Sequence, residues 1–143
     1  MKRLVLDTNV LAAAFRSRNG ASFLILRMVA RRQVKLLLTT ALLLEYEAVL
    51  KRAEHVAVHG LPLPHIDEAI EEIAALAEPV EIHYRWRPQL IDPKDEMVIE
   101  AAINGHADAL VTHNVRDFRS AAARFGLKIL RPKEYLERGH HEQ

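Results

Sequence analysis

The chain has 143 residues, of which half are hydrophobic and 27% are charged, with 20 basic residues, 19 acidic residues and no cysteine. This length and apolar fraction suffice for one hydrophobic core, so we expect one domain over residues 1–138 and a flexible tail over residues 139–143. The absence of cysteine excludes disulfides, thiol catalysis and cysteine-ligated zinc or iron–sulfur sites, and it is compatible with the cytoplasm, where we expect the protein.

The nearly neutral total conceals an uneven charge distribution. Residues 1–36 hold eight basic residues and one acid, residues 37–118 hold six and fifteen, and residues 119–143 hold six and three. A domain with a polyanionic partner shows such a pattern, although solvated helix faces produce it as well. We expect no membrane anchor, because even the longest apolar region contains Thr and Glu and is shorter than the roughly 20 apolar residues that span a bilayer.

Short apolar runs alternate with helical patterns along the chain. In the first half, the pattern predicts a strand over residues 3–6, helices over 8–15 and 20–31, a strand over 34–38 and a helix over 40–52. In the second half, it predicts a loop over 55–64, a helix over 66–76, a strand over 80–83, a helix over 93–104, a strand over 109–112, a turn over 114–118, a helix over 120–125 and a strand over 128–130. Strands that alternate with helices predict an α/β fold with a parallel sheet.

Capping residues support the predicted helix boundaries. Thr8 or Asn9 is expected to cap the first helix, and Thr39 or Thr40 the helix that follows the second strand. Pro93 suits the first turn of the helix over residues 93–104, where acidic side chains are also favoured.

Four acids are expected near one edge of this sheet, because ligands of open parallel sheets bind outside the carboxyl ends of the strands. Asp7 follows the first strand, Asp117 follows the strand over residues 109–112, and Glu45 and Asp95 come from helices. Each acid alone has an ordinary structural explanation as a cap, a first-turn acid, a turn residue or a solvated side chain. Together they would repel one another unless a divalent cation such as Mg²⁺ neutralised them.

Four motifs follow one another along the chain. They are LVLDTNVL at residues 4–11, LLLEY at residues 42–46, DPKDE at residues 92–96 and LVTHNVRDF at residues 110–118. Together they resemble a PIN-domain ribonuclease of the VapC-like branch, the single-domain toxins of toxin–antitoxin systems. The likeness runs from residue 2 to about residue 136. It implies a three-layer α/β sandwich with a mainly parallel sheet of about five strands and a Rossmann-like topology.

The resemblance also implies a catalytic metal site. Acids at the positions of Asp7, Glu45 and Asp95 are expected to bind Mg²⁺ or Mn²⁺ and to hydrolyse RNA phosphodiester bonds without a covalent intermediate. Many members of the family have Asp at the position of Asn114. The fourth ligand role is therefore expected to pass to Asp117, or Asn114 holds a water or a phosphate instead.

Further roles near this site follow from the same resemblance. Glu96 is an alternative to Asp95, which we prefer because it leaves apolar residues on the inward face of the helix. Thr8 or Asn9 is expected to orient Asp7 or the scissile phosphate.

Arg16, Arg18 and Arg116 are candidates for neighbouring RNA phosphates, although exposed arginines are common. The expected partners are RNA, an antitoxin protein that occludes the acidic site, and a second copy of the chain in a homodimer.

Other readings of the motifs are weaker. A phosphatase of the haloacid-dehalogenase type needs a second Asp two residues after the first, where this chain has Asn9, and a signal-receiver domain needs acids that are not evident. A non-catalytic RNA- or protein-binding module with a defective metal site is favoured by Asn114. His55 and His59 have zinc-like spacing but lack the HExxH pattern, so we expect them to be surface residues.

Overall fold

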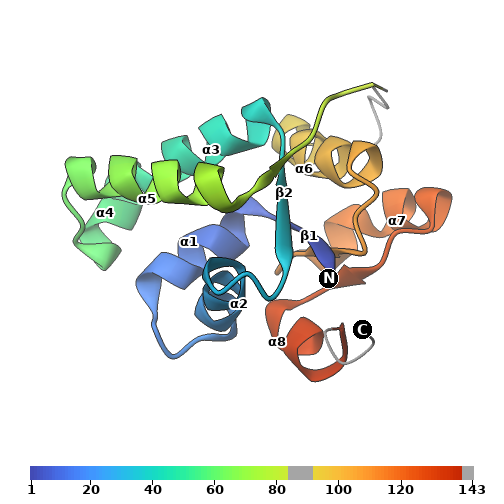
Figure 1. Cartoon of the computed structure of the whole chain (residues 1–143), viewed down its shortest axis with the longest axis horizontal. Helices are drawn as coiled ribbons and strands as arrows, with labels where there is room; N and C mark the ends of the chain where they lie inside the picture. Colours follow the sequence, from blue (N-terminus) through green and yellow to red (C-terminus); the bar gives the residue numbers. More distant parts are fainter. Residues whose placement is uncertain (84–91, 140–143) are drawn as a thin grey trace.

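The computed structural model describes residues 1–83 and 92–139 and contains a five-stranded sheet flanked by helices (Figure 1). The strands are β1 (Arg3–Leu6), β2 (Lys35–Leu38), β3 (Glu78–Pro79), β4 (Ala109–Val111) and β5 (Ile129–Leu130). They lie in the order β3-β2-β1-β4-β5, and each neighbouring pair is parallel. The predicted α/β fold with a parallel sheet is confirmed.

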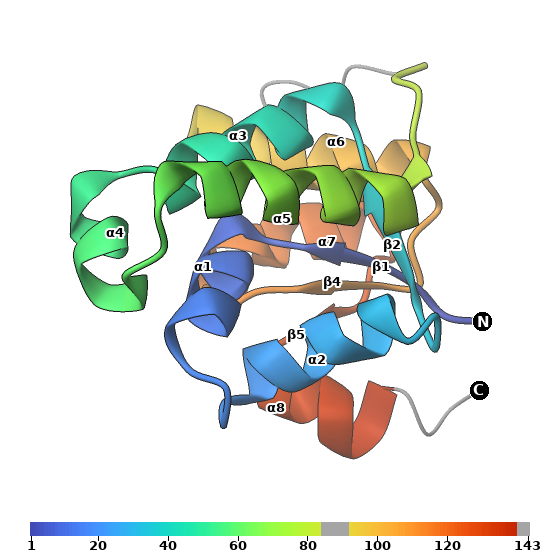
Figure 2. The ribbon, with the colours of Figure 1, turned by 60° about the vertical axis from the view of Figure 1, so that its left-hand side comes forward.

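Helices cover both faces of this sheet. They are α1 (Thr8–Arg16), α2 (Ala21–Ala30), α3 (Thr40–Leu50), α4 (Ala53–His59), α5 (Leu63–Leu76), α6 (Pro93–Asn104), α7 (Arg119–Phe125) and α8 (Pro132–Glu134). Figure 2 shows α3, α5 and α6 above the strands and α2 and α8 below them. In the described ranges, no helix combines the length and the apolar character that crossing a bilayer requires.

The central strands β1 and β4 bring the polar residues that follow them, Asp7 and Thr112, together at the carboxyl ends of the strands. Leu4, Val5 and Leu6 of β1 are almost fully buried, and Leu6 is in register with Val111 of β4. The backbone N–H of Asp7 donates to the carbonyl oxygen of Val111 at 2.9 Å, so the residue after β1 lies beside the end of β4. Hydrophobic burial thus sets the register, and the register places the first polar residues after each strand side by side.

One predicted loop is a helix in the structure. The pattern indicated a loop over residues 55–64, whereas α4 occupies Ala53–His59 and α5 begins at Leu63. None of the residues of α4 is fully buried, so the helix carries no strong apolar stripe that a periodicity argument detects. It ends at Gly60, whose φ of 69° is the left-handed conformation that glycine adopts without steric cost.

The third strand was predicted too far along the chain. The alternation over residues 80–83 favoured a strand there, but β3 consists of Glu78 and Pro79, which pair with β2. Val80 makes one more backbone hydrogen bond, to Leu38 at 2.8 Å, after which the N–H of His83 donates to the side chain of Asn104. A proline is tolerated in β3 because this strand lies at the edge of the sheet.

The end of the domain holds helical structure that the sequence pattern did not indicate. Helix α8 follows β5, and a π-helical turn continues over Tyr135–Gly139. Tyr135 is almost fully buried, so these residues close the core. Residues 140–143 of the predicted tail lie outside the described residues.

Candidate metal centre

Asp7 occupies the point where β1 ends and α1 begins. Its side chain accepts a hydrogen bond from the backbone N–H of Thr8 at 2.7 Å, which makes Asp7 the N-cap of α1 in place of the predicted Thr8 or Asn9. The hydroxyl of Thr112 donates to the other carboxylate oxygen at 2.7 Å. Burial raises the pKa of Asp7, and these hydrogen bonds oppose that shift. Both oxygens of a buried carboxylate are therefore held in place at the centre of the sheet edge.

Asp95 and Asp117 reach the same region from two other segments. Asp95 lies in the first turn of α6, and Asp117 lies in the 3₁₀ helix Val115–Phe118 that follows β4. Burial raises the pKa of Asp95 to about 6, and the negative charges of Asp7, Asp92, Asp117 and Glu96 add to the rise. Such repulsion requires Asp7 and Asp117 to lie within electrostatic range of Asp95. The structure thus brings three of the four predicted ligands to one edge of the sheet.

Glu45 lies near this region, but its charge is balanced by two cations. Its carboxylate is 3.5 Å from Arg52 and 3.6 Å from Lys94, the residue before Asp95. Only 14% of the Glu45 side chain is exposed. The next residue, Tyr46, is fully buried and donates its hydroxyl to the carbonyl oxygen of Leu6 at 2.5 Å. This bond ties α3 to the end of β1 and so positions Glu45 beside the start of α6.

The two acids of the DPKDE motif occupy different surroundings. Glu96 is only 3% exposed, whereas Asp95 is partly exposed and interacts electrostatically with both Asp7 and Asp117. Asp92 is the N-cap of α6 and accepts from the backbone N–H of Lys94 at 2.9 Å. These positions favour Asp95 over Glu96 as the residue that acts together with Asp7.

The predicted polar residues around Asp7 hold the loop after β4. The side-chain oxygen of Asn9 accepts a hydrogen bond from the backbone N–H of His113 at 3.4 Å. The backbone N–H of Asn114 donates to the Thr112 hydroxyl at 2.9 Å, while the Asn114 side chain is exposed. Asn9 and Asn114 therefore fix the loop that carries Thr112.

Two positioning residues were not identified from the sequence. Thr112 is fully buried and bonds directly to Asp7, and Tyr46 anchors α3. A Thr at the end of an apolar strand and a Tyr within an apolar helix stripe were the available signals, but ordinary packing explains both patterns equally well. The predicted phosphate-binding residues Arg16, Arg18 and Arg116 are all exposed.

The donor chemistry of this edge fits a hard divalent cation. Carboxylate oxygens are the ligands that Mg²⁺ prefers, and a cation removes the repulsion that raises the pKa of Asp95. Within residues 1–83 and 92–139, no group of three His, Asp or Glu side chains is arranged to hold a metal ion. Glu45 has to exchange its ion pairs with Arg52 and Lys94 before it can join Asp7 and Asp95 as a ligand.

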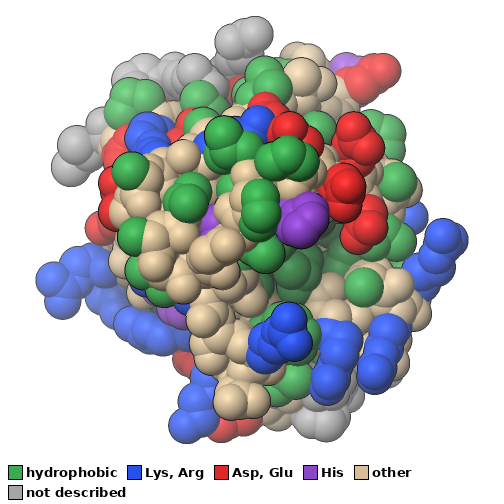
Figure 3. Space-filling model, turned by 90° about the vertical axis from the view of Figure 1, so that its left-hand side faces the viewer, with side chains coloured by type: hydrophobic (Ala, Val, Ile, Leu, Met, Phe, Trp, Pro, Cys, Tyr) green, Lys and Arg blue, Asp and Glu red, His purple; other side chains and the backbone are tan. Residues whose placement is uncertain are grey.

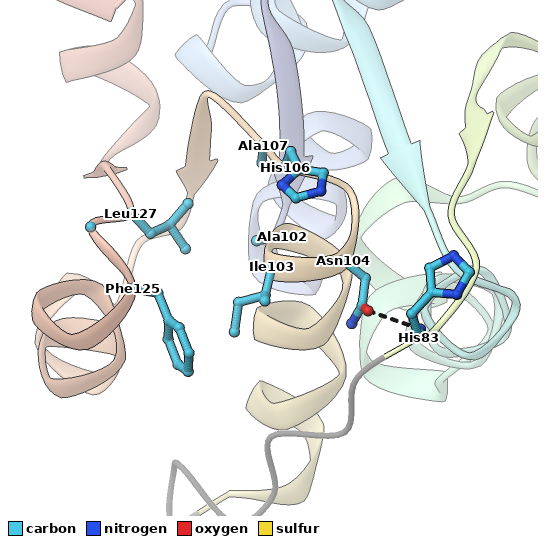
Figure 4. A pocket seen from close by; sticks show the side chains of 9 residues that line it. His83, Ala102, Ile103, Asn104, His106, Ala107, Phe125 and Leu127 are labelled. Atoms are coloured by element: carbon cyan, nitrogen blue, oxygen red, sulfur yellow. Dashed lines mark hydrogen bonds between the residues drawn. The ribbon is translucent and has the colours of Figure 1, made fainter.

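A separate cavity of about 440 Å³ lies at the other end of α6. Figure 4 shows His83 and Asn104 on one side of it, joined by a hydrogen bond of 2.9 Å, and Phe125 and Leu127 on the other. None of the predicted site residues lines this cavity. The carboxyl ends of the strands, with Asp7, Asp95 and Asp117, form what we call the acidic edge. This acidic edge, rather than the cavity, is the candidate site for chemistry.

The sequence matches the PIN domain over residues 3–116, which is most of the chain. The chain belongs to the PIN-domain family. Members of this family are typically metal-dependent nucleases, in agreement with the acidic edge described above. A comparison with curated proteins found no match to this PIN domain.

Solved structures share the fold at low sequence identity. VapBC2 from Rickettsia felis, bound to a DNA fragment from its promoter, matches with a TM-score of 0.59 and 16% identity, over 90% of this chain and 96% of that chain. VapBC-1 from nontypeable Haemophilus influenzae matches with a TM-score of 0.58 and 17% identity, over 92% and 98%. FitAB bound to the IR36 DNA fragment matches with a TM-score of 0.56 and 15% identity, over 90% and 94%.

Proposed function

We propose that this PIN domain is a Mg²⁺- or Mn²⁺-dependent endoribonuclease and the toxin of a cytoplasmic toxin–antitoxin pair. The supporting observation is that Asp7 and Asp117, from two separate segments, both lie within electrostatic range of Asp95 at the carboxyl edge of the sheet. Acids gathered in this way destabilise one another unless a cation accompanies them. A role in folding alone therefore explains their placement poorly.

Asp7, Glu45, Asp95 and Asp117 are the residues that would hold the metal ion. When bound, Mg²⁺ or Mn²⁺ supplies Lewis-acid stabilisation of phosphate oxygens and a lower pKa for an attacking water. Thr112 keeps the Asp7 carboxylate in one orientation through its 2.7 Å hydrogen bond. Because Asp7 is buried and already oriented, it requires little reorganisation when the RNA backbone arrives.

The main alternative is a PIN-fold binding module without catalytic activity. Glu45 favours it, because its ion pairs with Arg52 and Lys94 keep that carboxylate away from a shared cation. A haloacid-dehalogenase-type phosphatase is disfavoured by the PIN-domain match. Calorimetric titration with Mn²⁺ separates the two remaining readings, because the binding module should show no carboxylate-dependent metal site.

The direct test is cleavage of total RNA with and without Mg²⁺ or Mn²⁺. The wild type should cleave only with metal, and Asp7→Asn and Asp95→Asn should reduce the rate by about 100-fold or more, since even residues that merely support metal ligands contribute about 10–100-fold. Asp67→Asn is the matched control, because Asp67 is an exposed acid on α5 that pairs with Lys51. Wild-type rates in folded Asp7→Asn protein would contradict the proposal.

The proposed protein partner is an antitoxin, as the structural neighbours are toxin–antitoxin complexes. An apolar groove of about 280 Å³ between α2 and α5 is a suitable surface for an amphipathic antitoxin segment, with Phe15, Phe23 and Leu26 on one side and Ile73 and Leu76 on the other. Figure 3 shows acidic side chains over α5 and basic side chains below them, on either side of hydrophobic surface. Co-purification with such a partner supports this assignment, and size-exclusion chromatography tests the expected homodimer.

A further inference from the structure

A group of cationic and imidazole side chains lies beside the acidic edge. His113 follows Thr112 at the end of β4, and Arg131 follows Leu130 at the end of β5. The backbone N–H of Thr112 donates to the carbonyl oxygen of Leu130 at 2.9 Å, so the chain leaves the sheet at neighbouring points on these two strands. His113 and Arg131 therefore emerge next to each other, one residue beyond the contact that orients Asp7.

The His113 side chain is held at the start of α2. Its Nε2 atom is 3.5 Å from the hydroxyl of Ser22, which is buried in the first turn of that helix. Its backbone is held separately through the side chain of Asn9. The imidazole thus lies between the start of α2 and the end of β4.

Arg16 and Arg131 surround this imidazole. Burial lowers the pKa of His113, Asp7 opposes that shift, and the positive charges of Arg16 and Arg131 lower the pKa further. Both guanidinium groups therefore lie within electrostatic range of the ring. The three side chains come from the end of α1, the end of β4 and the end of β5, and we call them the cationic cluster.

The charges of the cationic cluster are largely available to an outside ligand. Arg16 is exposed, and its side chain forms no ion pair or hydrogen bond within the described ranges 1–83 and 92–139. The side chain of Arg131 is 57% exposed, and its ion pair to Glu134 is long, at 3.6 Å. The positive charges of two arginines near one imidazole disfavour its protonation, and both charges attract an anion to this position.

We propose that Arg16, His113 and Arg131 bind an RNA backbone phosphate adjacent to the phosphate at the acidic edge. This inference rests on the proposed nuclease function and names the path of the substrate strand. Guanidinium groups match the geometry of phosphate oxygens, and contacts to the backbone set the register of a nucleic acid without reading its sequence. His113 directly follows Thr112, which hydrogen-bonds to Asp7, so a strand bound at Asp7 would pass beside this cluster, which favours RNA over an acidic protein as the ligand.

The test measures binding of a short, fluorescein-labelled, single-stranded RNA by fluorescence anisotropy over a series of salt concentrations. Ca²⁺ replaces Mg²⁺ in the buffer, and a gel checks that the RNA stays intact. Arg16→Gln and Arg131→Gln should each weaken binding on the order of tenfold and reduce the slope of log Kd against log salt by about 0.7, the value for one phosphate contact of a single strand. Arg31→Gln is the matched control, because Arg31 is an exposed arginine at the opposite end of α2.

His113→Ala should weaken RNA binding and leave the salt slope unchanged. A neutral imidazole donates a hydrogen bond to phosphate but releases no counterion, so its loss differs from the loss of an arginine. A change in slope equal to that of Arg131→Gln would contradict this part of the proposal.

The outcomes separate this inference from the proposed function. If the wild type cleaves RNA and the Arg16 and Arg131 variants bind RNA with the affinity and slope of Arg31→Gln, the phosphate site is wrong and the nuclease function stands. If the variants lose RNA binding in a protein that never cleaves RNA, the phosphate site stands and the nuclease function is wrong. If they lose only the binding of a co-purifying protein, the cluster is a protein interface and the phosphate proposal is overturned.

Discussion

Similar charged residues lie at the amino ends of the strands, which we call the amino edge, and at their carboxyl ends, the carboxyl edge. Their arrangements at these two edges are opposite. At the amino edge, the guanidinium group of Arg3 forms an ion pair with Glu78 at 2.7 Å and donates to the carbonyl oxygen of Gly105 at 2.6 Å. The backbone N–H of the same residue donates to the carboxylate of Asp108 at 2.7 Å. A cation here joins β1, β3 and the C-terminus of α6, where a positive charge is favoured.

At the carboxyl edge, charges of the same sign are brought together. Asp7 and Asp117 both repel Asp95, and close by Arg16 and Arg131 approach the same imidazole. At the amino edge, Arg3 pairs with groups of the same chain, and these contacts contribute to the stability of the fold. The carboxyl edge leaves its charges to be satisfied from outside, by a cation and a phosphate in our proposal. Substitutions at the amino edge should therefore mainly lower stability, whereas substitutions at the carboxyl edge should mainly weaken binding.

Among residues that would not themselves bind the metal, Thr112→Val should produce the largest effect at the carboxyl edge. It removes the hydroxyl that orients Asp7 and keeps a similar side-chain volume, so Mn²⁺ affinity and RNA cleavage should fall by about 10–100-fold. Calorimetric titration with Mn²⁺ measures the affinity, and thermal denaturation checks that the variant folds. Thr40→Val, at an exposed position in α3, is the control. Unchanged Mn²⁺ affinity in folded Thr112→Val protein would show that Asp7 needs no such support.

Gly105→Ala should affect the amino edge without affecting metal binding. An added Cβ would lie 2.8 Å from the carbonyl oxygen of Ala101 and 2.9 Å from a methyl carbon of Leu37, so we expect the free energy of unfolding to fall by about 1–3 kcal/mol. Urea denaturation measures the loss. Gly20→Ala should change stability less, because the nearest atoms there are 3.7 Å away. A loss of Mn²⁺ affinity in Gly105→Ala would show that the two edges are coupled.

On stability, Asp95→Asn should have a smaller effect, and its sign depends on whether metal is bound. The pKa of Asp95 in the fold, about 6, lies above its ordinary value of 3.8, so the metal-free folded state binds more protons than the unfolded state between these values. Stability should therefore fall as the pH rises from 3.8 to 6, and in EDTA at neutral pH the variant should melt at a higher temperature than the wild type.

Adding Mg²⁺ should reverse this order, because only the wild type retains the ligand. Thermal denaturation over this pH range, with EDTA and with Mg²⁺, tests both signs. Asp67→Asn should show neither change. A lower melting temperature of Asp95→Asn in EDTA would mean that Asp95 stabilises the metal-free fold and that repulsion is not its main interaction.

Local patterns in the sequence determined much of the fold. The apolar runs predicted β1 and β2, Thr39 caps α3 as one of two expected residues, and α6 begins at Pro93 and ends before Gly105 as expected. These features depend on residues close together in the chain, which is why pattern and capping predict them. The same reasoning failed for α4, which has no buried face, and for β3, whose position depends on pairing with β2.

The acids of the candidate site were also named from the sequence, since polar residues after parallel strands point to a shared edge. Only the tertiary structure decided how their charges interact. The bond from Thr112 to Asp7, the pairing of Glu45 with Arg52 and Lys94, and the approach of Arg131 to His113 all join residues from different segments of the chain. The sequence thus determined which chemical groups are present, whereas the register of the buried strands decided which of them meet, because burial of apolar side chains fixes that register independently of the polar residues that follow.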